Sequence, residues 1–204
     1  MVGEITLSKS FEVFPTIGII PKTEEIITTS VGLFEKFLRE VGCKKKIIVT
    51  IQEDDGDIRR HCVSDKIITR ETGWQIYKIN EEGEIYIFYC SNTDLEREFW
   101  KNEIMTNINA KSLQGEVEKN MDIGYSWCIK KTMNQPPLIC LYYGFLAIAI
   151  ARLTKGIIHS TDGAWDYSRL PVRDIDFEKE YLNQSLLMDE ILRNDVSNWV
   201  KSVL

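Results

Sequence analysis

The alternation of hydrophobic and polar positions divides the chain into a strand-rich first half and a helix-rich second half. Runs of β-branched and aromatic side chains are separated by acidic or glycine-containing turns, which is typical of an antiparallel meander; they occupy residues 46–52, 58–63, 74–79 and 84–90. Residues 125–130 alternate between apolar and polar side chains, as a half-exposed strand does. The first twenty residues, which contain two prolines, favour short strands or extended edges.

Apolar side chains at helical spacing predict five helices, over residues 30–41, 95–110, 136–153, 175–182 and 185–202. Ser30 is the expected N-cap of the first. Thr93 and Glu96 form a capping box before the second, with a hydroxyl at the N-cap and a carboxylate three residues later. The polar segment 111–122 predicts a mobile connection.

The helix at 136–153 is hydrophobic all round, which predicts that it lies in the centre of the core. Its continuous apolar stretch, 138–151, is shorter than the roughly 20 residues that cross a bilayer, so a buried helix is the better interpretation. Gly144, Ala147 and Ala151 form a stripe of small side chains that lets another element approach closely.

Together these patterns predict an α+β fold. An antiparallel sheet with flanking helices forms the N-terminal half, and a mostly helical C-terminal part surrounds the buried apolar helix. At 204 residues the chain fits a single domain, 1–204, with a soft boundary near 111–122. A chain of this size buries roughly 70% of its unfolded surface and needs no disulfide bonds or metal ions to stabilise its core.

Charge and cysteine content narrow the function classes. The formal net charge of −6 disfavours direct nucleic-acid binding and is compatible with solubility or with a basic partner. The start of the chain lacks the pattern of a secretory signal. Five cysteines without a C-x-x-C pair predict neither a disulfide framework nor a zinc site, and they fit a reducing cytoplasm.

Motifs for phosphate, dinucleotide and acyl-transfer chemistry do not occur in the sequence. An EF-hand register that places Gly56 sixth in the loop puts Ile51 first and Cys62 last, and neither side chain supplies the required carboxylate. The same register at Gly83 puts Lys78 first. We therefore expect no metal and no cofactor.

The run His159 to Asp162 contains the residue types of a catalytic triad. On a strand, however, His159 faces away from Ser160 and Asp162, so the three cannot meet locally. The alternatives are a catalytic His159 with remote partners or a strand-end histidine with an ordinary hydrogen bond. His61 and Cys62 could join a metal site, but no ligand spacing supports one. We therefore predict that the chain is not an enzyme, although a carboxylate pair brought together by the fold stays open.

Residues 156–171 are dense in turn-forming and interface-forming side chains. Trp165 could fill the core while Asp162 and Asp166 bond to backbone donors, which would make a packed turn. Alternatively, Trp165 and Tyr167 could anchor a partner, because tryptophan and tyrosine are enriched at interfaces. Asp162, Trp165, Asp166 and Tyr167 are accordingly candidate partner-binding residues.

The C-terminal third resembles bacterial immunity proteins of polymorphic and contact-dependent toxin systems. The resemblance lies in the alanines of the apolar helix, the run Leu153 to Ile158 and the run Ser160 to Asp166, with Tyr125 and Trp127 preceding them. It covers residues 122–183. It implies a cytoplasmic protein that binds and blocks its own toxin, and many such toxins are nucleases with basic clefts.

Two acidic turns in the first half would complement a basic toxin surface and speed association. Their candidate partner-binding residues are Glu53, Asp54, Asp55, Asp57, Glu81, Glu82 and Glu84. The leading hypothesis is thus an immunity protein that neutralises a cognate toxin domain without touching membrane or nucleic acid. The alternatives are another protein-binding or regulatory module and, less favoured, a hydrolase whose site has no known motif.

Overall fold

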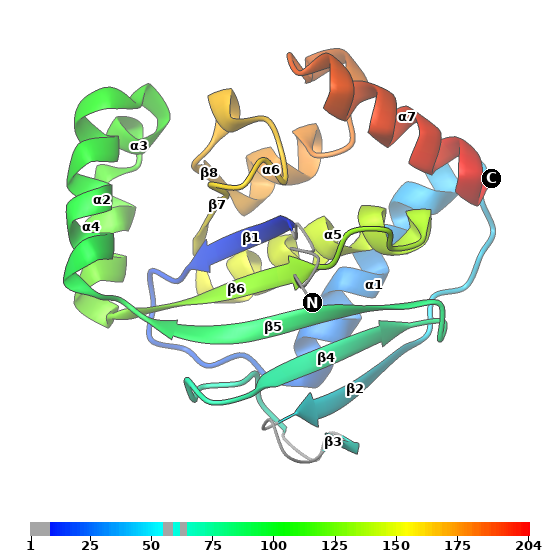
Figure 1. Cartoon of the computed structure of the whole chain (residues 1–204), viewed down its shortest axis with the longest axis horizontal. Helices are drawn as coiled ribbons and strands as arrows, with labels where there is room; N and C mark the ends of the chain where they lie inside the picture. The colour runs from blue at the N-terminus through cyan, green and yellow to red at the C-terminus, as the bar shows by residue number, and fades with distance from the viewer. Residues whose placement is uncertain (1–8, 55–58, 62–64) are drawn as a thin grey trace, which may run out of the picture.

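One antiparallel sheet runs through the computed structural model, which describes residues 9–54, 59–61 and 65–204. Within these residues the sheet has eight strands in the order β3-β2-β4-β5-β6-β1-β7-β8 (Figure 1). The strands are β1 (Lys9–Phe14), β2 (Val49–Asp54), β3 (Arg59–His61), β4 (Trp74–Ile79), β5 (Gly83–Ser91), β6 (Tyr125–Lys131), β7 (Ile157–His159) and β8 (Val172–Arg173). The predicted α+β class is confirmed, and three strands from the second half extend the sheet.

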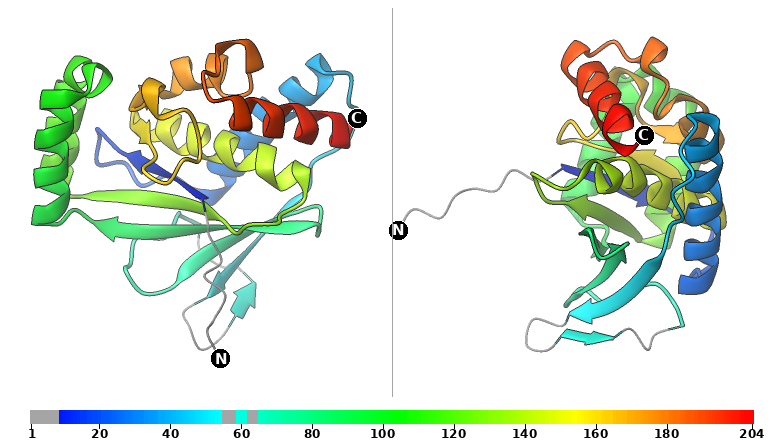
Figure 2. Two further views of the ribbon diagram at one scale, coloured as in Figure 1. Left: turned by 45° about the horizontal axis from the view of Figure 1, so that its top comes forward. Right: turned by 90° about the vertical axis from the view of Figure 1, so that its right-hand side faces the viewer.

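The helices lie in two groups. Helices α1 and α5 lie behind the sheet in Figure 1, whereas α2, α3 and α4 stand at one end of it. Figure 2 shows α7 on the side of α5 that faces away from the sheet. The bounds are α1 (Thr23–Glu40), α2 (Asp94–Thr106), α3 (Ile108–Ser112), α4 (Gln114–Ile123), α5 (Pro137–Thr154), α6 (Asp174–Glu180) and α7 (Glu190–Val203), with short 3-10 turns at Tyr167–Arg169 and Gln184–Leu186.

Helix α5 forms the centre of the core, as the sequence predicts. Among the described residues it is the one helix long and apolar enough to cross a membrane by length and composition alone, and 83% of it is buried inside the fold. The predicted close approach occurs at Gly144, where a Cβ atom would lie 2.1 Å from Cζ of Tyr181. The Tyr181 hydroxyl donates to the carbonyl of Cys140 on the same helix.

Three helix boundaries differ clearly from the sequence prediction. Helix α7 begins at Glu190, not at residue 185, because residues 184–186 form a separate 3-10 turn and Asp189 is the N-cap. Helix α1 begins at Thr23, so Ser30 lies inside the helix and is not its N-cap. The Ser30 hydroxyl is buried, lies 2.7 Å from the Ile26 carbonyl and shares a 2.7 Å hydrogen bond with the Tyr142 hydroxyl on α5. The helix predicted over 95–110 is interrupted at Asn107, whose side chain accepts from the backbone N–H groups of Asn109 and Ala110 and begins α3.

The prediction of a mobile connection at 111–122 is wrong. This segment forms the end of α3 and all of α4. Its polar side chains cover the solvent side, while Leu113 and Val117 join Phe14 and Trp100 in a small second core. The capping box at Thr93 is confirmed: Glu96 N–H donates to the Thr93 hydroxyl oxygen, and the Glu96 carboxylate accepts from the Thr93 backbone.

Candidate partner-binding surface

The strand register places a row of unlike side chains across the face of the sheet that points away from α5. Directly opposite residues on neighbouring strands share a face. Glu12 pairs with Cys128 on one side and with His159 on the other, and Cys128 pairs with Phe88. The indole of Trp74 continues the row, with its ring centroid 5.0 Å from that of Phe88.

A second row lies beside the first on the same face. Tyr86 pairs with Lys130, and Lys130 pairs with Ser10. The Trp74 ring also contacts Tyr86 edge to face at 6.1 Å, and the Lys130 ammonium lies 5.9 Å from the centre of the Phe88 ring. We call these two rows the open face; its members are Ser10, Glu12, Trp74, Tyr86, Phe88, Cys128, Lys130 and His159.

Of the described helices, α2, α3 and α4 cover only one end of this face. They enclose Phe14, Ile157 and the His159 end of the first row. Figure 1 shows β4 and β5 facing the viewer with no described helix in front of them. Trp74 at this uncovered end is 37% exposed, and Tyr86 and Phe88 are half-buried. The open face thus changes from partly exposed aromatic side chains at β4 and β5, where Ile76 opposite Tyr86 is nevertheless fully buried, to polar and enclosed side chains at β7.

Glu12 occupies the centre of the open face on β1. Burial, together with the negative charges of Asp162 and Glu96, raises the pKa of its carboxyl to about 7. Burial also raises the pKa of the neighbouring Cys128 thiol to about 12, so that thiol stays protonated and is a poor nucleophile. The centre of the face therefore carries an acid whose charge changes near neutral pH.

His159 differs from one of the sequence alternatives, the strand-end histidine with an ordinary hydrogen bond. Its ring is fully buried between Phe99, Trp100 and Tyr167. Neither ring nitrogen has a hydrogen-bond partner among the described residues, so the expected ordinary hydrogen bond is absent there. Burial lowers its pKa to about 4, although the Glu103 carboxylate acts in the opposite direction. At neutral pH the imidazole is uncharged.

Strand β7 ends at His159, so the predicted strand alternation does not extend to Ser160 and Asp162. The Ser160 hydroxyl donates to Asp162 Oδ1 at 3.1 Å. The Ser10 hydroxyl donates to Asp162 Oδ2 at 2.7 Å and so joins this exposed carboxylate to β1. Asp162 therefore lies at the edge of the open face, next to Glu12.

The rest of the predicted loop, 165–167, divides between core and surface. Trp165 is 3% exposed, donates its indole N–H to the Tyr181 carbonyl at 3.0 Å and packs edge-on against Phe177. Asp166 is also buried; burial opposes its ionisation, yet hydrogen bonds from Ser168 and Met188 hold its pKa below the usual value. The packed-turn interpretation thus describes Trp165 and Asp166.

Tyr167 is the accessible aromatic residue of that turn. It is 49% exposed, and its hydroxyl donates to the Glu103 carboxylate at 2.7 Å. This hydrogen bond, followed by burial, raises the pKa of Tyr167. Tyr167 and Asp162 are therefore the two members of the predicted loop that a partner could reach.

The carboxylates of the two acidic turns mostly bond within the chain. Glu53 lies 3.5 Å from Arg70, Glu82 lies 2.6 Å from Lys45, and Glu84 lies 3.4 Å from Lys78. Glu81 accepts from the Thr50 hydroxyl at 3.4 Å. Asp54 ends β2, and Asp55 and Asp57 lie outside the described residues. Much of the charge of these turns is therefore already balanced locally.

The open face was not identified as a site from the sequence. The signal that could have found it is the alternation within β5, which puts Tyr86 and Phe88 on the same side as Glu84 and Cys90. Their association with Glu12 and His159 depends on the order of the strands, which local patterns do not specify. His61 belongs to β3, and Cys62 lies outside the described residues.

The described residues contain no group of three or more His, Cys, Asp and Glu side chains that could hold a metal ion. No protein-family model, curated protein or solved structure matches the chain. The candidate site therefore has to be evaluated from its own geometry.

Proposed function

We propose that this chain is an immunity-type binding protein that neutralises a cognate toxin domain by docking the open face of its sheet onto it. The observation that carries the proposal is the cluster of Trp74, Tyr86 and Phe88 on a part of the sheet that no described helix covers. Aromatic side chains are the usual anchors of protein interfaces, because they bury large areas at low entropic cost.

The overall charge of the chain favours a basic partner. The net charge is −6, and Glu12 and Asp162 carry carboxyl groups at the β1 side of the open face, whereas the Lys130 ammonium lies over Phe88 in the aromatic cluster. A basic toxin surface would stabilise the ionised form of Glu12 and so bring its raised pKa down on binding. Above pH 7 Glu12 is already ionised before the partner binds, so binding does not have to remove its proton. We therefore expect tighter binding above pH 7 than below it.

The resemblance of residues 122–183 to immunity proteins supplies the class of partner. A toxin with a nuclease activity and a basic cleft fits the net charge of −6 of the whole chain. The acidic turns of β2–β3 and β4–β5 belong to the same proposal as steering groups, which would change the rate of association more than the final affinity.

Protection of growing cells tests this proposal. The variable C-terminal domain of a large secreted protein encoded beside this chain is expressed in a bacterium with and without the chain. We expect growth to stop without the chain and to continue with it, and we expect the two proteins to co-purify. A toxic domain that the chain neither binds nor neutralises contradicts the proposal.

The surface is tested with matched variants in the same assay. Trp74→Ala removes the exposed anchor, and Ile175→Ala on α6, where the side chain is 53% exposed, is the control for losing exposed apolar area elsewhere. We expect Trp74→Ala to weaken binding by at least about tenfold, since interface tryptophans often contribute more than 2 kcal/mol. Equal effects of the two variants would remove the open face from the proposal.

An alanine series across Glu53, Asp54, Asp55, Asp57, Glu81, Glu82 and Glu84 tests the steering role. We expect slower association and a weaker dependence of the association rate on salt. Unchanged protection and unchanged salt dependence would contradict the steering role of the turns but not the docking role of the open face.

A second candidate function rests on Glu12 and His159. They are cross-strand neighbours in which burial raises the pKa of an acid to about 7 and keeps a base uncharged at neutral pH, a combination found at sites of proton transfer. If the chain is a hydrolase, Glu12→Gln should abolish hydrolysis and leave toxin binding in place. If the chain is only a binding protein, neither the parent nor the variant should hydrolyse any substrate. Hydrolysis assays of generic ester and phosphodiester substrates separate the two.

A further inference from the structure

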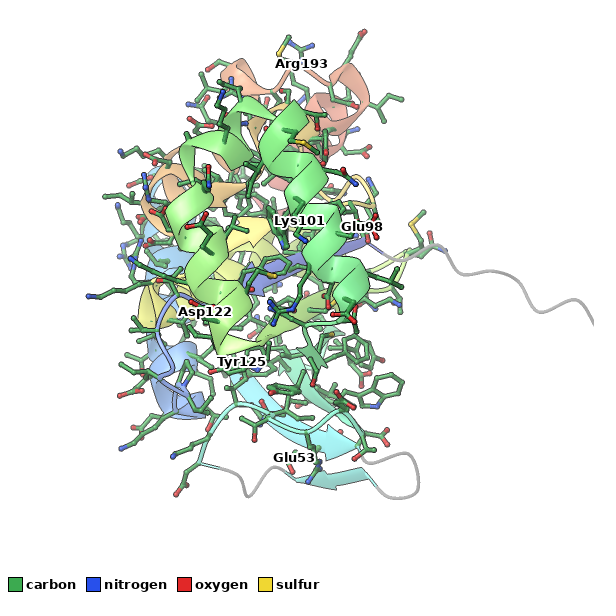
Figure 3. The ribbon with its side chains drawn as sticks, turned by 90° about the vertical axis from the view of Figure 1, so that its left-hand side faces the viewer. Glu53, Glu98, Lys101, Asp122, Tyr125 and Arg193 are labelled. Atoms are coloured by element: carbon green, nitrogen blue, oxygen red, sulfur yellow. The ribbon has the colours of Figure 1, made fainter. Side chains whose placement is uncertain are left out.

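A groove runs between α2 and α4 on the end of the molecule that Figure 3 faces. It has a volume of about 630 Å³. Trp100 and Val117 form its buried floor, and Ile104 and Met121 are half-buried along its walls. Met105 at its upper end is 74% exposed and extends the apolar surface of the groove.

The two walls carry opposite charges at matching heights. The guanidinium of Arg97 on α2 donates to the Met121 carbonyl on α4 at 2.9 Å, so Arg97 is level with Met121 and Asp122. Lys101 lies one turn further along α2, and Glu118 lies one turn back along α4. Because the two helices run in opposite directions, this spacing puts Lys101 level with Glu118.

Two of the four rim side chains form hydrogen bonds within the chain: Arg97 donates to the Met121 carbonyl, and Glu118 accepts from the Gln114 side chain at 2.7 Å. Arg97, Lys101, Glu118 and Asp122 are all exposed, and none forms an ion pair within 4.0 Å with any described residue. The α2 rim is therefore basic and the α4 rim acidic, with an apolar floor between them.

This pattern is complementary to itself under one of two possible twofold rotations. Two copies can face each other groove to groove about an axis parallel to the helices or about an axis across them. The axis across the helices would set α2 on α2, with like charges opposed. The parallel axis sets α2 of one copy on α4 of the other and preserves height, so Arg97 meets Asp122 and Lys101 meets Glu118.

We propose that the groove between α2 and α4 binds a second copy of this chain, forming a symmetric four-helix bundle. Each copy contributes α2 and α4, and Met105, Ile104 and Met121 of both copies fill the centre. The helices have 13 and 10 residues, so the interface is small and the dimer should be concentration-dependent. The interface lies at the end of the sheet and leaves Trp74 accessible, so it does not depend on the proposed function.

Sedimentation equilibrium of the full chain, from micromolar to millimolar concentration, tests the dimer. We expect a reversible monomer–dimer equilibrium that weakens as salt is added, because the rim charges are exposed. The double variant Arg97→Glu with Lys101→Glu makes both rims acidic, and Glu118→Lys with Asp122→Lys makes both basic. Each variant alone should dimerise at least about tenfold more weakly.

Mixing the two double variants is the decisive measurement. In a mixed dimer each acidic rim faces a basic rim, so we expect the heterodimer to form with the affinity of the parent dimer. The control is Glu98→Lys with Lys119→Glu, which reverses two exposed charges on the same helices outside the groove. It should leave dimerisation unchanged, and circular dichroism checks that every variant is folded.

Three results would overturn the proposal. The parent chain could remain monomeric over the whole range, as it would if the groove took a helix of another protein. The mixed variants could fail to associate although both are folded. The control variant could disrupt the dimer as strongly as the rim variants, which would place the contact elsewhere.

Discussion

The two faces of the sheet are built from alternate residues of the same strands, yet they differ in what their side chains do. On the face toward α5, Phe11, Val13, Trp127 and Ile129 are all fully buried and contact one another or the helix. On the open face, the intervening positions hold Glu12, Cys128 and Lys130 beside an exposed tryptophan. Burial of apolar area is the main driving force of folding, so the first face specifies the fold.

The open face contributes little to that driving force and carries chemistry that folding does not require. An acid with a raised pKa reduces stability as the pH rises through 7, and a partly exposed indole stabilises the fold less than a buried one does. Proteins keep such groups chiefly where binding or catalysis uses them. Substitutions on the two faces should therefore separate stability from function.

The largest expected loss of stability comes from Trp165→Ala. This residue lies in the turn for which the sequence allowed two interpretations, a turn packed in the core or one exposed to a partner. The substitution removes a buried indole, its hydrogen bond to Tyr181 and its contact with Phe177, and should cost about 4 kcal/mol. Urea unfolding followed by circular dichroism measures it. Tyr167→Phe, two residues away, removes one partly exposed hydrogen bond and should cost less than about 1 kcal/mol. Similar costs would contradict the division of this turn.

A smaller loss is expected from Gly144→Ala on the covered side. The added methyl would overlap the buried ring of Tyr181, which hydrogen-bonds to α5 and cannot move freely, so the cost should be about 3 kcal/mol. Gly32→Ala in α1 is the matched control, because a Cβ atom there meets nothing within 4 Å. It should stabilise the helix by up to about 1 kcal/mol. A neutral Gly144→Ala would contradict the tight contact between α5 and Tyr181.

Features with a local cause could be predicted from the sequence. The uniform apolar composition of α5, the hydroxyl and carboxylate of the Thr93 capping box and the alternation in β6 each act within a few residues. Helix α4 was missed because its apolar side is narrow, with Val117 as its main buried apolar residue. The start of α1 was missed because Ser30, a typical cap, bonds to Tyr142 on a distant helix instead.

The open face could not be predicted, because it depends on which strands become neighbours. Glu12 and His159 lie far apart in the chain and meet only because β1 inserts between β6 and β7. The acidic turns were visible in the sequence, but the cations that pair with them, such as Lys45 and Arg70, were not assigned to them. Local patterns give the type of each element, whereas charge balance and burial depend on the assembled sheet.

The pH dependence of stability tests the centre of the open face. Raising the pKa of Glu12 from 4.5 to about 7 means that its stabilising contribution is complete below pH 4.5 and is lost as pH rises through 7. At pH 8 the buried charge should cost on the order of 2 kcal/mol. Glu12→Gln keeps the neutral form at every pH, so it should be more stable than the parent at pH 8 and nearly equal to it at pH 4. Urea unfolding across this range measures the difference.

The contribution of His159 to stability changes with pH in the opposite direction from that of Glu12, so the effects of the two groups can be measured separately. The pKa of His159 falls from 6.5 to about 4 on folding, so its contribution is complete above pH 6.5 and is lost as pH falls toward 4. In Glu12→Gln this acid-side loss should persist, while the loss above pH 5 should largely disappear. A parent protein whose stability rises between pH 5 and pH 8 as steeply as the variant's would contradict the environment assigned to Glu12.

The smallest change in stability is expected from Trp74→Ala, and this makes it the sharpest test of the difference between the faces. Trp74 is partly exposed, and its ring packs edge-on against those of Phe88 and Tyr86, so its removal should cost no more than about 1 kcal/mol. Phe11→Ala on the covered face removes a fully buried ring and should cost about 4 kcal/mol. If the open face binds a partner, the order reverses for affinity: Trp74→Ala weakens binding in a stable protein, whereas a folded Phe11→Ala protein still binds. A Trp74→Ala protein as unstable as Phe11→Ala would show that the indole serves the fold, and the exposed aromatic cluster would then need no partner to explain it.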